Sequence, residues 1–324
     1  MSIGECRRAC FRLRQLQLRP TLGGLPLVKR STREQLPPTR TTTTMTTNPQ
    51  HHPSSPPPKY AHTRRESFHP VHELLYWPDF PGRGEFIRLA FEAKGIPYTD
   101  VTNTEVGGYD KLLAHIDPKA THAPVPSGPS DPIAFAPPIV RVPTENLTIS
   151  QTPAILAYLG AHHHFAGDGS EAQKYHVHSL ALTALDLNDE AHDSHHPISV
   201  NFYYEEQKQE ALRRSKDFRE KRIPKFFSFF DRVLQGNFDK GKGKYLVGNK
   251  LSYADTTLWQ VLDGLKYAFP KEMAAREKEF ELLFGTFYNS VKEEKGVKLY
   301  LESERRLPYG NGVYRHYPEL DRQE

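Results

Sequence analysis

The strongest constraint on the fold lies between His72 and Gly95, where the hydrophobic period of the sequence changes. A short apolar run ends at Tyr76, and prolines and glycines then break the backbone, as in a strand that leads into a tight turn. From Gly84 onward, apolar residues repeat at the spacing of one helix face: Phe86, Leu89, Ala90 and Ala93. The pattern places Tyr76 where a strand ends and a helix begins, a position at which α/β folds bind anionic ligands.

The segments that follow predict the rest of an α/β domain. Their apolar patterns indicate strands at 98–101, 138–142 and 147–149, a short helix at 109–115, and a helix after Gln151. The resulting order is βαβ, then α, then ββα. The Pro-rich stretch 117–137 exceeds the usual limit of about 12–15 residues for a structureless loop, which indicates a functional or mobile segment.

The second half of the chain has helical patterns throughout. They cover residues 173–193, 205–218, 223–233, 253–267, 280–291 and 296–303. Ser252 and Asp255 stand at the spacing of a capping box, with Asp in the place of Glu. The helix that they start is rich in apolar residues, so we expect it to be the buried centre of an all-α domain.

Length and charge set limits on the domains. The 324 residues fit two domains of about 100–200 residues each and leave an extension at the N-terminus. Residues 1–44 hold nine Lys/Arg against two Glu, so the rest of the chain carries −3 of the total +4 and gives no reason to expect nucleic-acid binding. No apolar run of about 18 residues is present, so we expect no transmembrane helix.

The extension allows two interpretations. Residues 1–30 are Arg-rich and nearly free of acid, as in a mitochondrial transit peptide; alternatively, translation starts later, at Met45, or the segment is disordered. Residues 37–58 are rich in Pro and Thr and are predicted to be disordered. Both cysteines, Cys6 and Cys10, lie in the N-terminal extension. Their position excludes a disulfide framework, a cysteine zinc site and a catalytic cysteine in the folded part.

Two of these segments, 72–95 and YLVGNKLSYAD at 245–255, resemble glutathione transferases, and the resemblance extends over roughly residues 70–320. It implies an α/β N-terminal thioredoxin-like domain at 68–163 and an all-α C-terminal domain at 170–320. Residues 1–67 lie outside it, and their composition predicts a disordered N-terminal extension. The subtype that it resembles uses a tyrosine hydroxyl, as the sigma, pi, alpha and mu classes do. Tyr76 matches that residue.

The resemblance also implies a glutathione site. A cis-proline before the third strand, matched by Pro138 with Pro137 as second candidate, exposes the backbone of its neighbour Ile139 to glutathione. Gln151 and Thr152 match a Gln-Ser pair that holds the γ-glutamyl group at a helix N-terminus. Thr in place of Ser keeps the hydroxyl and adds a methyl group, so specificity can differ. The alternative is that Ser150 or Thr152 only caps the helix.

The chemistry implied for Tyr76 is stabilisation of a thiolate. A thiol such as that of glutathione has a pKa of about 8.5, and a hydroxyl that donates to sulfur favours the anion. Residues 77–88 contain no Ser or Thr and the folded part has no Cys, which favours Tyr76 in this role. The alternative is that Tyr76 is an aromatic plug at the end of a strand.

Other residues near the turn are candidates for binding. Arg83 either braces the turn or binds a glutathione carboxylate. The turn is longer than is usual in the family, and we expect Trp77 and Phe80 to line a pocket for the electrophile. Tyr109 and Lys111 are weaker candidates for glutathione contacts.

Histidines cluster after the helix at 173–193. His192 and His196 are spaced i, i+4 and could share one helix face, but no HExxH motif or fourth ligand is present, so we expect no metal. We expect these two histidines to line the substrate pocket or to serve the structure.

Together these features predict a glutathione transferase that conjugates glutathione to small hydrophobic electrophiles. The resemblance implies a homodimer, in which Asp186 or Asp189 could act across the interface. We expect a cytoplasmic protein, or a mitochondrial one if the extension is a targeting signal. Two alternatives remain: a glutathione-dependent isomerase or peroxidase that uses the same site, and a non-catalytic scaffold with this fold.

Overall fold

The computed structural model describes residues 72–117, 133–241 and 243–323. The predictions for the extension at 1–67, with its possible targeting signal, and for most of the Pro-rich stretch lie outside these residues. In chain order the elements are β1 (His72–Leu75), α2 (Gly84–Lys94), β2 (Tyr98–Asp100), α3 (Val101–Thr104), α4 (Gly108–Ile116), β3 (Ile139–Val142), η1 (Pro143–Glu145), β4 (Leu147–Ser150), α5 (Thr152–His162), α6 (Glu171–Asp193), η2 (Tyr204–Gln207), α7 (Lys208–Asp217), η3 (Phe218–Arg222), α8 (Ile223–Asp239), α9 (Tyr253–Ala268), α10 (Pro270–Glu279), η4 (Leu282–Tyr288), α11 (Asn289–Lys292), α12 (Lys295–Leu301) and η5 (Pro318–Leu320).

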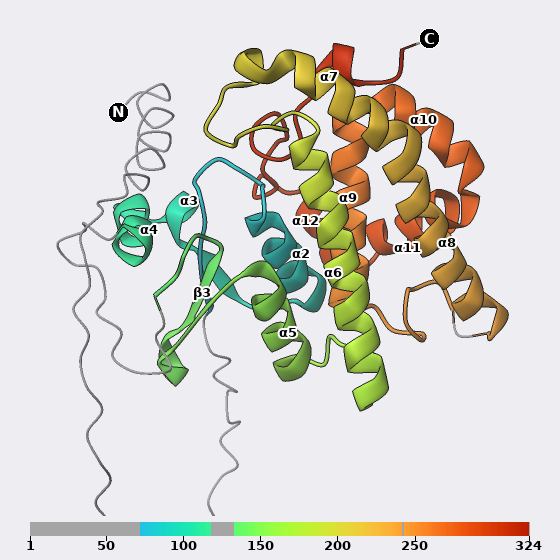
Figure 1. The fold of residues 1–324 in the computed structure, drawn as a ribbon. Helices are drawn as coiled ribbons and strands as arrows, with labels where there is room; N and C mark the ends of the chain where they lie inside the picture. Colours follow the sequence, from blue (N-terminus) through green and yellow to red (C-terminus); the bar gives the residue numbers. More distant parts are fainter. Residues whose placement is uncertain (1–71, 118–132, 242, 324) are drawn as a thin grey trace, which may run out of the picture. The chain divides into compact units, whose positions relative to one another are not determined.

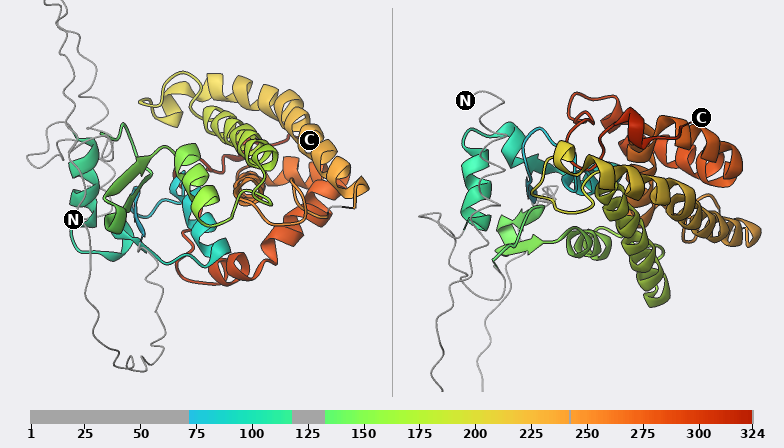
Figure 2. Two further views of the ribbon diagram at one scale, coloured as in Figure 1. Left: turned by 90° about the horizontal axis from the view of Figure 1, so that it is seen from below. Right: turned by 45° about the horizontal axis from the view of Figure 1, so that its top comes forward.

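The four strands form one sheet in the order β2-β1-β3-β4. Strand β1 is parallel to β2 and antiparallel to β3, and β3 forms the predicted hairpin with β4. Helices α2 and α5, which come after β1 and β4 in the chain, lie on one side of the sheet, and α4 lies on the other side (Figures 1 and 2). This α/β part, followed by an all-α part, confirms the predicted fold class. The predicted domain boundaries stay predictions.

Alternation along the strands explains why both faces of the sheet are covered. Leu74 and Val140 point into the main core with the apolar faces of α2 and α5. Leu75 and Ile139 point the other way, into a smaller cluster with Leu112 of α4. Because successive residues of β1 and β3 are buried on opposite faces, a slip of one residue in register would exchange the two clusters.

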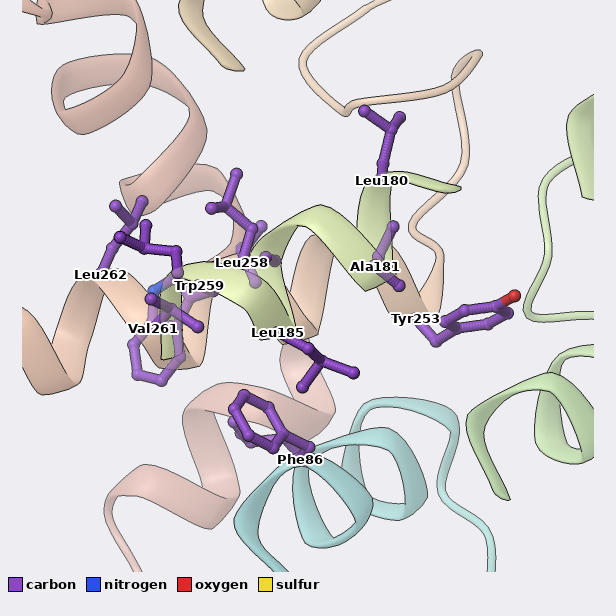
Figure 3. Close-up of a cluster of buried hydrophobic side chains, with 14 of the residues drawn as sticks. Phe86, Leu180, Ala181, Leu185, Tyr253, Leu258, Trp259, Val261 and Leu262 are labelled. Carbon is purple, nitrogen blue, oxygen red and sulfur yellow. The ribbon is translucent and has the colours of Figure 1, made fainter. Parts of the chain in front are cut away.

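Helix α9 is the buried centre of the helical part, as the sequence predicted. Trp259 and Leu262 of α9 and Leu185 of α6 lie in one apolar cluster, into which Phe86 of α2 also projects (Figure 3). Burial of each such side chain contributes about 1.5–3 kcal/mol, so this shared core links the α/β part to the helices. The capping box at Ser252 forms as predicted, with both of its hydrogen bonds present.

Helix α10 was not predicted from the sequence, because its only buried residues are Glu272 and Met273. Its first turn is held by a residue from the end of the chain. Asp321 is buried, and its carboxylate accepts hydrogen bonds from the backbone N–H groups of Lys271 (2.9 Å) and Glu272 (3.0 Å). A carboxylate at a helix N-terminus accepts hydrogen bonds from the free N–H groups and interacts favourably with the helix dipole. A tertiary contact therefore supplies the N-terminal cap that the local sequence of α10 does not provide.

Candidate functional site

Three predicted site residues meet at one end of the sheet. Leu75 of β1 pairs with Ile139 of β3, and Ile139 in turn pairs with Ser150 of β4. One step beyond these pairs, both antiparallel ladders bring Tyr76 and Gln151 to either side of Pro138. The register therefore collects residues that are up to 75 positions apart in the printed sequence.

Tyr76 lies under the turn that leads into α2. Its side chain is 7% exposed, and its hydroxyl oxygen accepts a hydrogen bond of 2.8 Å from the backbone N–H of Arg83. A Cβ atom on Gly84 would lie 2.6 Å from Cγ of the Tyr76 ring, and one on Gly82, where φ is +42°, would overlap the Tyr76 hydroxyl. Both glycines are therefore needed for the backbone to approach the ring this closely.

Arg83 connects the turn to the helical part. Its guanidinium forms an ion pair with Asp189 of α6, and both side chains are partly exposed. Asn188 also donates to Asp189 (3.1 Å). Of the two roles considered for Arg83, the structure shows a brace, while glutathione binding stays a prediction. Asp189 is engaged within its own chain, and a role for it or Asp186 in a dimer stays a prediction.

The peptide bond between Pro137 and Pro138 is cis, which confirms the predicted cis-proline at Pro138. It immediately precedes β3. The side chain of Ile139 is fully buried in the smaller apolar cluster, and its backbone pairs with strands on both sides. Strand β3 begins one residue after Pro138, and glutathione binding by Pro138 and Ile139 stays a prediction.

The start of α5 follows Gln151, one of the predicted glutathione-binding residues. Gln151 adopts φ +74° and ψ 120°, its side chain is exposed, and no side chain in the described part of the chain caps the helix. Capping by Ser150 or Thr152 is therefore not what the structure shows. Thr152 is 1% exposed, and its hydroxyl has no hydrogen-bond partner among the described residues. A buried polar atom normally has a partner, so this hydroxyl calls for one.

The predicted pocket residues have separate surroundings. Trp77 is half-buried and packs on the smaller cluster of β1 and α4. Phe80 lies on the other side of the turn, next to the C-terminal segment, since a Cβ atom on Gly312 would lie 3.9 Å from its ring. Trp77 and Phe80 thus contact different parts of the fold, and their binding role stays a prediction.

The sequence did not indicate that the C-terminal segment borders this turn. Tyr314 anchors the segment, because its buried ring packs on Gly264 and its hydroxyl donates to Asn188 (3.1 Å). Gly264 in the middle of a predicted helix was a signal of such close packing. Nothing local in the sequence indicated which segment would fill the space.

Three histidines adjoin at the end of α6. The rings of His192 and His196 are stacked with centroids 5.2 Å apart, and His195 lies within 5.3 Å of both. His195 is 2% exposed and its Nε2 lies 2.8 Å from the carbonyl oxygen of Val313. Because a carbonyl only accepts, Nε2 carries the proton. Burial lowers the pKa of His195 well below its ordinary value, against the opposing effect of this hydrogen bond.

This burial predicts a contribution to acid sensitivity. On unfolding, His195 takes up a proton near its ordinary pKa of about 6.5, whereas the folded state resists it, so stability falls as pH drops below that value. We expect His195→Gln to lose less stability than wild type between about pH 7 and about pH 5. Denaturant midpoints at both pH values measure this. His176→Gln, at an exposed position on α6, should behave like wild type; equal pH sensitivity in His195→Gln would contradict the prediction.

Other predictions of binding groups concern α4 and metals. Lys111 forms an ion pair with Glu105 (2.5 Å), and glutathione contacts by Tyr109 and Lys111 stay predictions. In residues 72–117, 133–241 and 243–323, no group of three His, Cys, Asp or Glu residues is arranged to hold a metal ion. Within the same part of the chain, no helix has both the length and the apolar character needed to span a membrane.

Comparison with known proteins points to one family. Residues 192–304 match the family model described as glutathione S-transferase, C-terminal domain. A glutathione S-transferase of Plasmodium falciparum is 24% identical over 212 residues, which cover 65% of this chain and 86% of the relative. One of Plasmodium yoelii yoelii is 22% identical over 228 residues, covering 70% and 92%.

Solved structures share the fold. A prostaglandin synthase D of Nilaparvata lugens aligns with a TM-score of 0.53 and 18% identity, covering 74% of this chain and all of that one. A Pi-class glutathione S-transferase of Onchocerca volvulus aligns with a TM-score of 0.52 and 19% identity, covering 72% and 92%. At these identities the solved structures support only the fold. The similarity to glutathione S-transferases rests on the family model and on the two sequence relatives. Residues 192–304 thus match the C-terminal domain of glutathione S-transferases, and 65–70% of the chain is similar in sequence to proteins of that name.

Proposed function

We propose that this protein conjugates glutathione to small hydrophobic electrophiles, with the hydroxyl of Tyr76 stabilising the glutathione thiolate. The observation that carries the proposal is the register of the sheet, which aligns Tyr76, the cis-proline Pro138 and Gln151 at one end of the strands. These residues come from three segments, and the family uses groups of these types at the corresponding positions.

The state of the Tyr76 hydroxyl supports this role. Its oxygen accepts from the N–H of Arg83, and a phenol hydroxyl that accepts one hydrogen bond can still donate its proton, here to the sulfur of glutathione. Donation to the thiolate favours the charged form of the thiol. The sulfur then attacks the electrophilic carbon: a C–S bond forms, and with an aryl halide the C–halogen bond breaks and halide leaves with its electron pair.

The start of α5 is the proposed site of the γ-glutamyl group. Backbone N–H groups at a helix N-terminus attract a carboxylate, and the exposed amide of Gln151 adds donors to them. A carboxylate bound there is also an acceptor that would end the isolation of the Thr152 hydroxyl. Half-buried Phe80, beside the C-terminal segment, is the proposed start of the electrophile side. The protein is proposed to act as a homodimer, as its family does.

Calorimetric titration with glutathione, followed by an aryl-halide conjugation assay, tests the proposal. Binding together with turnover is the expected result. Binding without turnover of several electrophile classes would move the assignment to an isomerase or peroxidase, which assays with those substrates identify. No binding by the wild-type protein would contradict the proposal and favour the scaffold alternative.

Thr152→Val should separate binding from stability. The substitution removes a buried hydroxyl that has no partner among residues 72–117, 133–241 and 243–323, so we expect unchanged or increased stability, by up to about 1 kcal/mol. Loss of a hydrogen bond to a charged ligand should weaken glutathione binding by about tenfold. Denaturant unfolding and calorimetry measure the two effects.

A matched control is Thr257→Val in α9, where the hydroxyl is also buried but donates to the carbonyl of Tyr253 (2.7 Å). This variant should lose about 1 kcal/mol of stability and bind glutathione normally. Unchanged glutathione affinity in Thr152→Val would remove Thr152 from the proposed site.

A further inference from the structure

Arg88 is a fully buried cation on α2, in contact with the turn above Tyr76. Its Nη1 donates to the backbone carbonyls of Phe80 and Pro81, at 3.3 Å each. Its Cζ lies 5.9 Å from the centroid of the Tyr76 ring. One guanidinium therefore binds the turn and lies within cation–π distance of the Tyr76 ring.

The same turn sets the environment of the Tyr76 hydroxyl. The carbonyl of Pro81 also accepts from the N–H of Glu85 (2.9 Å), which fixes the turn on the first residues of α2. Two residues after Pro81, the N–H of Arg83 reaches the Tyr76 oxygen. A shift of the Phe80–Pro81 carbonyls would therefore move this N–H relative to the hydroxyl.

Arg88 is itself held from two sides. Its Nε donates to Asp100 at the end of β2 (2.7 Å), and its Nη1 pairs with Glu85 (3.1 Å). Glu85 is fully buried and also binds Arg306 and the hydroxyl of Tyr300 (2.6 Å). Burial raises the pKa of Glu85, but Arg306, Arg88 and these hydrogen bonds together hold it below its ordinary value. Glu85 is thus a charged partner that fixes Arg88 in place.

We propose that Arg88 is a positioning residue for Tyr76: its guanidinium fixes the Phe80–Pro81 carbonyls so that the N–H of Arg83 stays on the Tyr76 hydroxyl. The kinetic part of this inference rests on the proposed function, and its structural part does not.

The effect is one of geometry rather than of net charge. The charged groups nearest to Tyr76 occur as pairs or groups of opposite sign: Arg83 with Asp189, and Arg88 with Glu85 and Asp100. An N–H bond to the phenol oxygen stabilises negative charge on that oxygen, and it strengthens the donation of the hydroxyl proton to a sulfur. Loss of this bond weakens that donation even if the ring stays in place.

Arg88→Lys tests the proposal because it keeps the charge and removes the planar fork that reaches two carbonyls and Asp100. We expect the acid limb of the kcat/KM profile to move to higher pH by about half a unit or more, since the thiolate is less stabilised. The control is Arg219→Lys, at another buried arginine, which donates to the carbonyl of Leu320 (2.9 Å). It should lose stability and keep the wild-type profile.

A second measurement does not depend on turnover. In protein labelled with 3-fluorotyrosine, the Tyr76 fluorine resonance is assigned by its disappearance in Tyr76→Phe and is titrated without glutathione. Its midpoint should rise in Arg88→Lys and stay unchanged in Arg219→Lys. An unchanged midpoint in folded Arg88→Lys overturns the inference, whatever the kinetics show. A raised midpoint supports it even if wild type does not turn over, in which case only the proposed function fails.

If Arg88→Lys does not fold, Asp100→Asn serves as the milder variant. It keeps the arginine and removes the charge that holds its Nε. A smaller shift in the same direction, in both the pH profile and the Tyr76 resonance, supports the inference. A folded Asp100→Asn protein with both wild-type readings overturns it.

Discussion

Replacement of Tyr76 by phenylalanine is expected to lower kcat/KM for glutathione conjugation by about 100-fold, because a positioned donor is worth about that much in the transition state. Glutathione affinity should change by no more than about twofold, since the substitution leaves the proposed carboxylate site at the start of α5 intact. The acid limb of the pH profile should also move toward the ordinary thiol pKa of about 8.5.

The structure also predicts a cost in stability for Tyr76→Phe. The N–H of Arg83 loses its acceptor, which costs about 1 kcal/mol and has to be measured separately by denaturant unfolding. Tyr98→Phe is the matched control, since it removes a hydroxyl that donates to Glu92 (3.0 Å) in the same part of the fold. That control should keep wild-type kcat/KM. Wild-type kcat/KM in Tyr76→Phe would refute the role of Tyr76 as thiolate donor.

Asp255→Ala is expected to lower the free energy of unfolding by about 3–5 kcal/mol, the range for breaking a buried polar network. Asp255 is fully buried and accepts from the N–H of Leu246 (2.8 Å) and from the N–H and hydroxyl of Ser252 (2.7 Å each). Two buried N–H groups would lose their acceptor, each at a cost of about 1–3 kcal/mol. Denaturant unfolding at neutral pH measures the loss.

An exposed capping contact provides the control for Asp255. Glu206 accepts from the N–H of Tyr203 (2.7 Å) at the start of η2, and Glu206→Ala should cost less than about 1 kcal/mol because water can replace the contact. If Asp255→Ala were as stable as wild type, the capping box would not be what holds the start of α9.

The charge state of Asp255 adds a test by pH. Burial raises the pKa of Asp255 from 3.8 to about 6, although its three hydrogen bonds oppose this shift. Between about pH 4 and about pH 6, Asp255 binds a proton more readily in the folded state than in the unfolded state. The contribution of Asp255 to stability therefore falls as pH rises through this range. Asp255→Asn should remove that part of the pH dependence.

The amino-acid sequence by itself determined the features that depend on local spacing. The change of period at Gly84 predicted the strand, turn and helix around Tyr76, and the spacing of Ser252 and Asp255 predicted the start of α9. Resemblance added the cis bond at Pro138, which no local rule selects over Pro137. These features were predictable because hydrogen bonds and apolar faces within one element repeat at fixed intervals.

The tertiary structure alone decided the partners of charged side chains. Glu85 matches a helix dipole in the sequence, yet in the structure it is buried and binds Arg306, 221 positions away. Arg83 binds Asp189 across 106 positions, and Asp321 caps α10 from 50 positions beyond Lys271. The physical reason is that such contacts depend on how helices pack in space, and the repeating pattern of one element carries no information about the position of another.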